Sequence, residues 1–149
     1  MALQIDFEIE GDKQISRRMN IVADGITDFK APLQLSASEF IRAFKQNFSS
    51  EGAMLGDKWP ARKPVYKNGA RIDTWALLRK TGKMYNSFRA QVSAEQLSVM
   101  NVAFQFKYHQ SNQPRSKIPR RVMMKLDEAR KRFVIKALQR YIIMLTRGN

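Results

Sequence analysis

Cysteine is absent from this 149-residue chain, so disulfide bonds, thiolate nucleophiles and cysteine-based zinc sites are excluded. Histidine occurs once, as His109, which excludes metal sites that need several histidines. The longest apolar run, Tyr141 to Leu145, is far shorter than the roughly 20 residues that span a bilayer. Residues 1–10 lack the basic and apolar regions of a signal peptide. We therefore expect a soluble protein made in a reducing compartment, with no membrane partner.

Acidic residues are scarce, because 13 Asp and Glu stand against 27 Lys and Arg, a formal net charge of +14. The charge is unevenly spread. Residues 1–30 carry six acidic and four basic side chains, residues 57–90 two acidic and nine basic, and residues 107–149 two acidic and twelve basic. An acidic beginning and a basic remainder allow a subunit to present unlike faces, as in a head-to-tail ring. The alternative is that Lys and Arg simply coat a solvated surface.

The apolar pattern predicts an α+β fold in a single domain, residues 1–149. Alternation with period two predicts strands, and apolar residues three or four apart predict helices. Pro32 is expected to end the first helix, and the capping-box spacing of Ser36 and Glu39 to open the second. The expected elements are a small antiparallel sheet from residues 3–9, 86–93, 97–103 and 121–126, packed by about three helices at residues 14–29, 37–49 and 127–146.

Two stretches, residues 50–80 and 110–120, are predicted to be flexible loops that contact partners. The first holds both tryptophans, several Gly and Pro residues and many cations, with one helical turn expected near residues 74–79. A short helical piece is expected at residues 104–109. The residues expected to act in these loops, with the first as an anchor against the core, are Trp59, Arg62, Lys63, Tyr66, Lys67, Arg71, Trp75, Arg115, Lys117, Arg120 and Arg121.

The long C-terminal helix is apolar on more than one side, and Asp127 is its expected N-cap. In so small a chain, a helix of this kind is expected to meet another subunit. The interface residues predicted on it are Phe133, Tyr141, Ile142 and Leu145.

No catalytic pattern stands out. Nucleotide-binding, serine-hydrolase and zinc-protease motifs are missing, and Asp127 and Glu128 suit helix capping better than acid–base work. His109 is expected to be a structural hydrogen-bonding residue, although a serine triad would need only one histidine. We expect no enzyme activity, no cofactor and no metal. Nonspecific DNA binding through cations and aromatic residues stays open as an alternative, since no helix-turn-helix, RNP-like strand or zinc motif favours sequence-specific recognition.

Several short motifs follow one another in a fixed order. Gly56-Asp57-Lys58-Trp59 precedes the basic loop, which is followed by Thr81-Gly82 with Ser87, by Tyr108-His109-Gln110 and by Ile118-Pro119-Arg120-Arg121. Over about residues 40–145 this order resembles the phage virion morphogenesis family, the tail-completion proteins of tailed phages. The motif positions are Gly56, Thr81, Gly82, Ser87, Tyr108, His109, Gln110 and Pro119, and each is expected to act as scaffold.

The resemblance implies a structural protein of the virion, assembled in the host bacterial cytoplasm. It would complete the tail or join it to the head at the neck or tail end, as a ring with six copies expected. Its partners would be itself and the neighbouring tail and head-connector proteins, with nonspecific contact to packaged DNA left open. A tail terminator or a head-side adaptor of the same architecture is an alternative that the sequence does not separate from tail completion.

Overall fold

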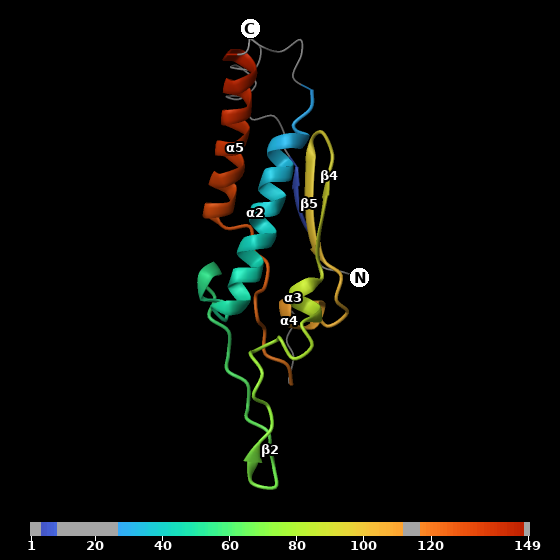
Figure 1. The fold of residues 1–149 in the computed structure, drawn as a ribbon, viewed down its shortest axis with the longest axis vertical. Helices are drawn as coiled ribbons and strands as arrows, with labels where there is room; N and C mark the ends of the chain where they lie inside the picture. Colours follow the sequence, from blue (N-terminus) through green and yellow to red (C-terminus); the bar gives the residue numbers. More distant parts are fainter. Residues whose placement is uncertain (1–3, 9–26, 112–116, 148–149) are drawn as a thin grey trace. The chain divides into compact units, whose positions relative to one another are not determined.

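The computed structural model describes residues 4–8 as backbone and residues 27–111 and 117–147 in full. Helices and strands alternate in no simple repeat, which confirms the α+β class (Figure 1). In chain order the elements are β1 (Gln4–Glu8), α2 (Lys30–Ser49), the 3₁₀ turn η1 (Ala53–Leu55), β2 (Tyr66–Lys67), β3 (Ala70–Arg71), α3 (Lys83–Asn86), β4 (Phe88–Val92), β5 (Gln96–Asn101), α4 (Phe106–Gln110) and α5 (Glu128–Arg147).

The described residues belong to two compact units. The first is built from Arg42–Arg89 and Met100–Lys125, and the second from Gln4–Ile41, Ala90–Val99 and the chain from Leu126 onward. The single domain expected from the sequence stays a prediction.

Three strands form one sheet in the order β1-β5-β4. The strands β4 and β5 are joined by a tight turn, in which the Ser93 N–H donates to the Gln96 carbonyl at 2.9 Å and the Ser93 hydroxyl accepts the Gln96 N–H at 3.0 Å. The strands predicted at residues 3–9, 86–93 and 97–103 are confirmed as β1, β4 and β5, and β5 begins one residue earlier than predicted.

Helix α2 begins earlier than predicted. The Asp28 carboxylate accepts the N–H of Lys30 at 2.8 Å, and the N–H of Leu33 donates to the Phe29 carbonyl at 3.1 Å. Pro32 fits in the first turn, where a helix has no partner for an N–H group. The Ser36 hydroxyl donates to the Pro32 carbonyl at 2.9 Å instead of capping. The predicted break at Pro32 and the capping box are therefore wrong.

The first helix is predicted at residues 14–29. Of these, residues 14–26 lie outside the described residues. Its last three residues are described and are not helical.

Aromatic side chains form the core of the first unit. Phe48 meets Trp59, Tyr85 and Phe88 edge-on, with ring centroids 5.2, 5.8 and 6.0 Å apart. Phe106 lies 6.3 Å from Phe88 in the same geometry. Edge-to-face pairs of this kind add stability beyond the apolar area that they bury. The second half of α2, β4 and α4 are joined through this cluster.

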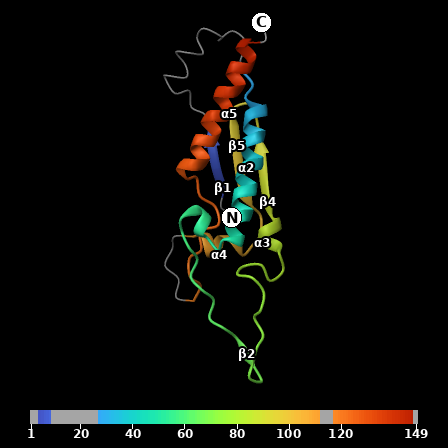
Figure 2. The same cartoon turned by 60° about the vertical axis from the view of Figure 1, so that its left-hand side comes forward.

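Helix α5 is the longest element of the second unit and lies beside the first half of α2 (Figures 1 and 2). The Asp127 carboxylate accepts the N–H of Arg130 at 3.0 Å, so the predicted N-cap is confirmed. Val134, Ala137 and Leu138 form its buried stripe. Within the described part of the chain, no helix is both long and apolar enough to cross a membrane.

The prediction of a strand at residues 121–126 is wrong. Side chains form hydrogen bonds with the backbone of this segment, in the place that a neighbouring strand would take. The Gln110 Oε1 accepts the N–H groups of Met123 and Met124 at 2.7 and 3.1 Å, and its Nε2 donates to the Met124 carbonyl at 2.7 Å. Asn47 and Trp59 both donate to the carbonyl of Val122, at 3.1 and 2.8 Å. Residues 121–124 are therefore buried without belonging to a sheet.

Candidate interaction surface

The basic stretch at residues 50–80 contains a β-hairpin that the sequence analysis did not predict. Its two strands are antiparallel, with Tyr66 opposite Arg71 and Lys67 opposite Ala70. Asn68 and Gly69 both have positive φ, 51° and 78°, as a type I′ turn requires. Within the first unit the hairpin projects away from α3 and α4 (Figure 1). An Asn-Gly pair between two short runs is the sequence signal that would have found it.

The helical turn predicted at residues 74–79 is not a helix. The N–H of Arg79 donates to the carbonyl of Ala76 at 3.0 Å, which closes a single turn.

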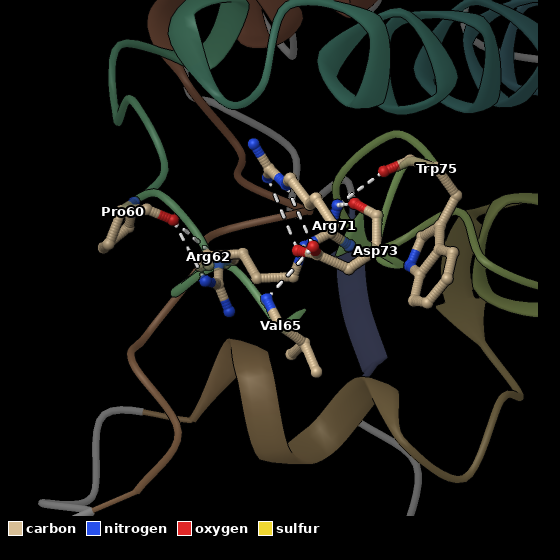
Figure 3. A network of polar contacts seen from close by, with 7 residues as sticks. Pro60, Arg62, Val65, Arg71, Asp73 and Trp75 are labelled. Carbon is tan, nitrogen blue, oxygen red and sulfur yellow. Dashed lines mark hydrogen bonds and ion pairs between the residues drawn. The ribbon is translucent and has the colours of Figure 1, made fainter. Parts of the chain in front are cut away.

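A buried carboxylate fixes the base of the hairpin. Asp73 is 1% exposed, and its two oxygens face the Nε atoms of Arg62 at 2.8 Å and Arg71 at 2.9 Å (Figure 3). The Val65 N–H donates to the same carboxylate at 3.1 Å. Arg62 also donates to the backbone carbonyls of Asp73 and Trp75, at 2.9 and 2.6 Å. Both strands are thereby tied to one anion.

The electrostatic state of this cluster follows from its hydrogen bonds. The bond from Arg71 holds the pKa of the Asp73 carboxyl well below its usual range, against the opposing effect of burial, and the N–H of Val65 adds to the shift. The same bond and charge raise the pKa of Arg71. Asp73 is therefore ionised at neutral pH and lies between two cations, an arrangement that suits a structural clamp better than proton transfer.

The surface of the hairpin beyond the clamp is cationic and partly apolar. Val65, Tyr66 and Ile72 are 50%, 63% and 46% exposed, and Lys63 and Lys67 are exposed as well. Residues 58–72 hold five basic side chains and no acidic one. Exposed apolar side chains on a fixed arm are typical of a surface that another molecule covers.

The two tryptophans have different positions. Trp59 is 4% exposed and lies in the core, as its predicted anchoring requires. Trp75 is half-buried, with the Arg62 guanidinium 5.1 Å and the Lys80 Nζ 4.7 Å from its ring centre. A cavity of about 480 Å³ lies between Trp75, the hairpin base and Glu51. Both cations lie close enough to the ring for a cation–π interaction.

The second predicted loop divides between surface and interior. Arg121 is 6% exposed, and its Nε and Nη2 donate to the Pro60 carbonyl at 3.1 and 3.0 Å, so it braces the first loop from inside. Burial, with the nearby charge of Arg62, lowers its pKa. Lys117 and Arg120 are exposed, and Arg115 lies outside the described residues.

Motif residues at the start of the β4–β5 region shape turns. Gly82 has φ +70° just before α3, and the Thr81 hydroxyl accepts the N–H of Lys83 at 3.4 Å. The Ser87 carbonyl accepts the N–H of Val102 at 3.1 Å. Gly56, with φ +81°, ends η1.

The remaining motif residues lie in or near α4. The His109 carbonyl accepts the N–H of Arg121 at 2.8 Å, and Gln110 holds residues 123–124 as described above. Tyr108 packs edge-on against Phe104, with ring centroids 5.3 Å apart. Pro119 is exposed. The Gln110 side chain thus holds neighbouring backbone in place, and the scaffold role of the other motif residues stays a prediction.

The end of α5 presents apolar side chains to solvent. Of the predicted interface residues, Phe133, Tyr141 and Ile142 are half-buried and Leu145 is 37% exposed. Tyr141 packs edge-on against Phe29 at 6.4 Å. Sequence reasoning did not single out four exposed apolar residues, three of them on this helix: Ile135, Ile143, Met144 and, after β5, Phe104.

Together, these features define an α+β protein with an exposed cationic and apolar hairpin that a buried ion cluster holds at its base. The model of the phage virion morphogenesis family matches residues 11–142, and the chain belongs to that family. It is thus a virion-associated assembly protein, and the family favours a structural over a catalytic role. None of the curated proteins compared with the chain matches it, and none of the solved structures does.

Proposed function

We propose that this protein completes the phage tail or joins it to the head, as a ring-forming component at the neck or tail end. The family supports a role in virion assembly. The observation that carries the finer proposal is the hairpin, because its exposed Val65, Tyr66 and Ile72 are held in a fixed position by a buried ion cluster. A surface on which Lys and Arg are simply solvated does not explain why apolar side chains are held exposed on this hairpin.

The mechanism is binding without chemistry. Exposed apolar residues at the end of α5 give one surface for a neighbouring subunit, and the hairpin gives a second, cationic surface. Because each of these surfaces differs from the face that it meets on the neighbouring copy, the contacts are heterologous, and such contacts close into a ring when the rotation permits. Six copies are the expected number. The net charge of +14 favours acidic neighbours in the tail and head connector.

The experiment is a phage deleted for this gene, examined by electron microscopy with and without the chain supplied from a plasmid. Loss of the protein should leave full heads and unfinished or unattached tails, and the supplied chain should restore complete particles. Complete, infectious particles in its absence would contradict the proposal. Whether the protein ends the tail tube or sits on the head side is decided by cross-linking it to its neighbours in assembled particles.

Nonspecific DNA binding is the second candidate, and the exposed cations of residues 58–72 favour it. It predicts tight binding of duplex DNA by the purified chain, with affinity falling steeply as salt rises. A gel shift at increasing salt separates the two candidates, since an assembly protein binds free duplex weakly.

A further inference from the structure

We propose that the β2–β3 hairpin of one copy adds to the free edge of strand β1 in the next copy, and so links subunits head to tail. This inference rests on the ring-forming function proposed above and names the surface through which the ring closes. Three observations carry it: a preformed hairpin, strand edges that no other described strand pairs with, and opposite charges on the two segments.

The hairpin is ordered before it meets a partner. A two-stranded ribbon is marginally stable by itself in water. Here the Asn68-Gly69 turn fixes one end and the Asp73 clamp fixes the other. The hairpin therefore loses most of its conformational entropy when the subunit folds, and it loses little more on docking.

Both segments have an edge to offer. Among the described strands, β2 and β3 pair only with each other, and β1 is the terminal strand of the order β1-β5-β4. A strand at an edge presents N–H and C=O groups that a strand of another molecule can pair with. Main-chain pairing of this kind supplies affinity, while side chains set the register and the choice of partner.

Charge selects β1 over the other edge. The strand β1 carries Asp6 and Glu8 and no basic side chain, whereas residues 58–72 hold five basic side chains and no acidic one. The opposite edge of the sheet is β4, which carries Arg89 and no acidic residue, and so repels the hairpin. Opposite charges facing each other across paired strands stabilise a sheet, and like charges destabilise it.

The apolar content of the hairpin favours a strand over nucleic acid. Val65, Tyr66 and Ile72 alternate with or flank the cations and are about half exposed or more. The β1 sequence, QIDFE, likewise alternates apolar with polar residues. A phosphate backbone would engage the lysines and leave the apolar side chains in water. Strand β1 of a second copy can contact both the cationic and the apolar side chains of the hairpin.

The absence of natural cysteine allows a direct test. One chain carries Lys67→Cys, and a differently tagged chain carries a single cysteine at position 4, 6 or 8. Both chains are supplied to the deletion phage, and the particles are oxidised mildly. Because each cysteine is on a separate chain, a mixed disulfide can only join two copies. We expect the mixed dimer at one position of β1. Lys83→Cys, on an exposed residue outside the hairpin, is the control and should give none.

A charge exchange tests the same contact without cross-linking. Lys63→Glu with Lys67→Glu, and separately Asp6→Lys with Glu8→Lys, should each lower the yield of complete particles by at least an order of magnitude. A single chain carrying all four changes should recover most of that yield. Lys30→Glu with Lys83→Glu changes the net charge as the first pair does, at exposed positions outside the hairpin, and should leave the yield unchanged.

The outcomes separate this inference from the proposed function. If deletion of the gene stops tail completion but the fourfold variant stays inactive and no mixed disulfide forms, the hairpin contact is wrong and the function stands. Cross-linking of position 67 to DNA or to another virion protein would also overturn the contact. If the deletion leaves particles complete, the proposed function itself is wrong.

Discussion

The indole N–H of Trp59 donates a 2.8 Å hydrogen bond to the backbone carbonyl of Val122, in the interior of the first unit. The bond joins the end of the Gly56–Trp59 motif to the segment after Pro119, which are distant in the sequence. Asn47 donates to the same carbonyl from α2. The Gly56–Trp59 motif is thus joined to the residue that follows the Ile118–Arg121 motif, as a scaffold role for these motifs would require.

Replacing Trp59 tests that role. Trp59→Phe keeps most of the apolar volume and removes the hydrogen bond, which should lower the free energy of unfolding by about 1 kcal/mol. Trp59→Ala should lower it by roughly 3–5 kcal/mol, because it also opens a cavity. Urea denaturation measures both. Trp75→Phe, at a half-buried ring, is the matched control and should change stability by less than about 0.5 kcal/mol. Equal effects at the two tryptophans would contradict this account.

Gly52 and Gly56 both have a left-handed backbone conformation, but we expect replacement by alanine to destabilise the protein more at one than at the other. Gly52 and Gly56 have φ of +92° and +81°. A Cβ on Gly52 would collide with the Asp57 carbonyl and the Trp59 ring, whereas a Cβ on Gly56 meets open space. Gly56→Ala should cost about 1–2 kcal/mol of stability, the usual penalty of this conformation. Gly52→Ala should cost clearly more, as thermal unfolding of the two variants will show. A similar loss for both would mean that the neighbours of Gly52 move aside easily.

Gln110→Met should destabilise the first unit strongly. The methionine fills a similar volume but leaves the N–H groups of Met123 and Met124 and the Met124 carbonyl without the partners that Gln110 gives them. Unsatisfied buried groups cost about 1–3 kcal/mol each. Chemical denaturation measures the loss. Gln105→Met, at an exposed position just before α4, should be close to neutral, and a neutral Gln110→Met would show that water replaces the amide.

The hairpin clamp should survive mild acid. Since the pKa of Asp73 is lowered in the folded chain, its stabilising effect is complete above the ordinary aspartate pKa of about 3.9 and is lost only as the pH falls through the lowered value. The Val65 amide resonance, followed by NMR, should stay constant from neutral pH to about pH 4 and change below it. A midpoint at or above the ordinary value would contradict the ion cluster. Asp73→Asn should show no such transition.

Periodicity was sufficient for the long elements and for the β4–β5 pair. The apolar spacing and Asp127 predicted α5, and alternation predicted β1, β4 and β5. Periodicity gave wrong predictions where the structure of a segment depends on side chains from elsewhere in the chain. Residues 121–126 contain a short apolar run, Val122 to Met124, and a strand was predicted there, yet Gln110 occupies the place of the partner strand. Pro32 looked like a helix breaker because sequence alone did not show that it stands in a first turn.

Composition marked the residues predicted to interact with partners, but it did not predict how they are arranged. A cluster of cations and aromatics marked residues 50–80, but Asp73 was passed over as an isolated acid. Its importance depends on Arg62 and Arg71 converging on it, and no spacing rule encodes that convergence. Arg121 counted as a surface cation for the same reason, although its guanidinium is buried against Pro60.

Cryo-electron microscopy of purified virions tests the central claim most directly, which is that this chain works by fitting against its neighbours. The account predicts density for a ring of this chain at the neck or tail end, with each β2–β3 hairpin seated on the adjacent copy. Particles that are complete and infectious without any density or mass-spectrometric trace of the chain would contradict it.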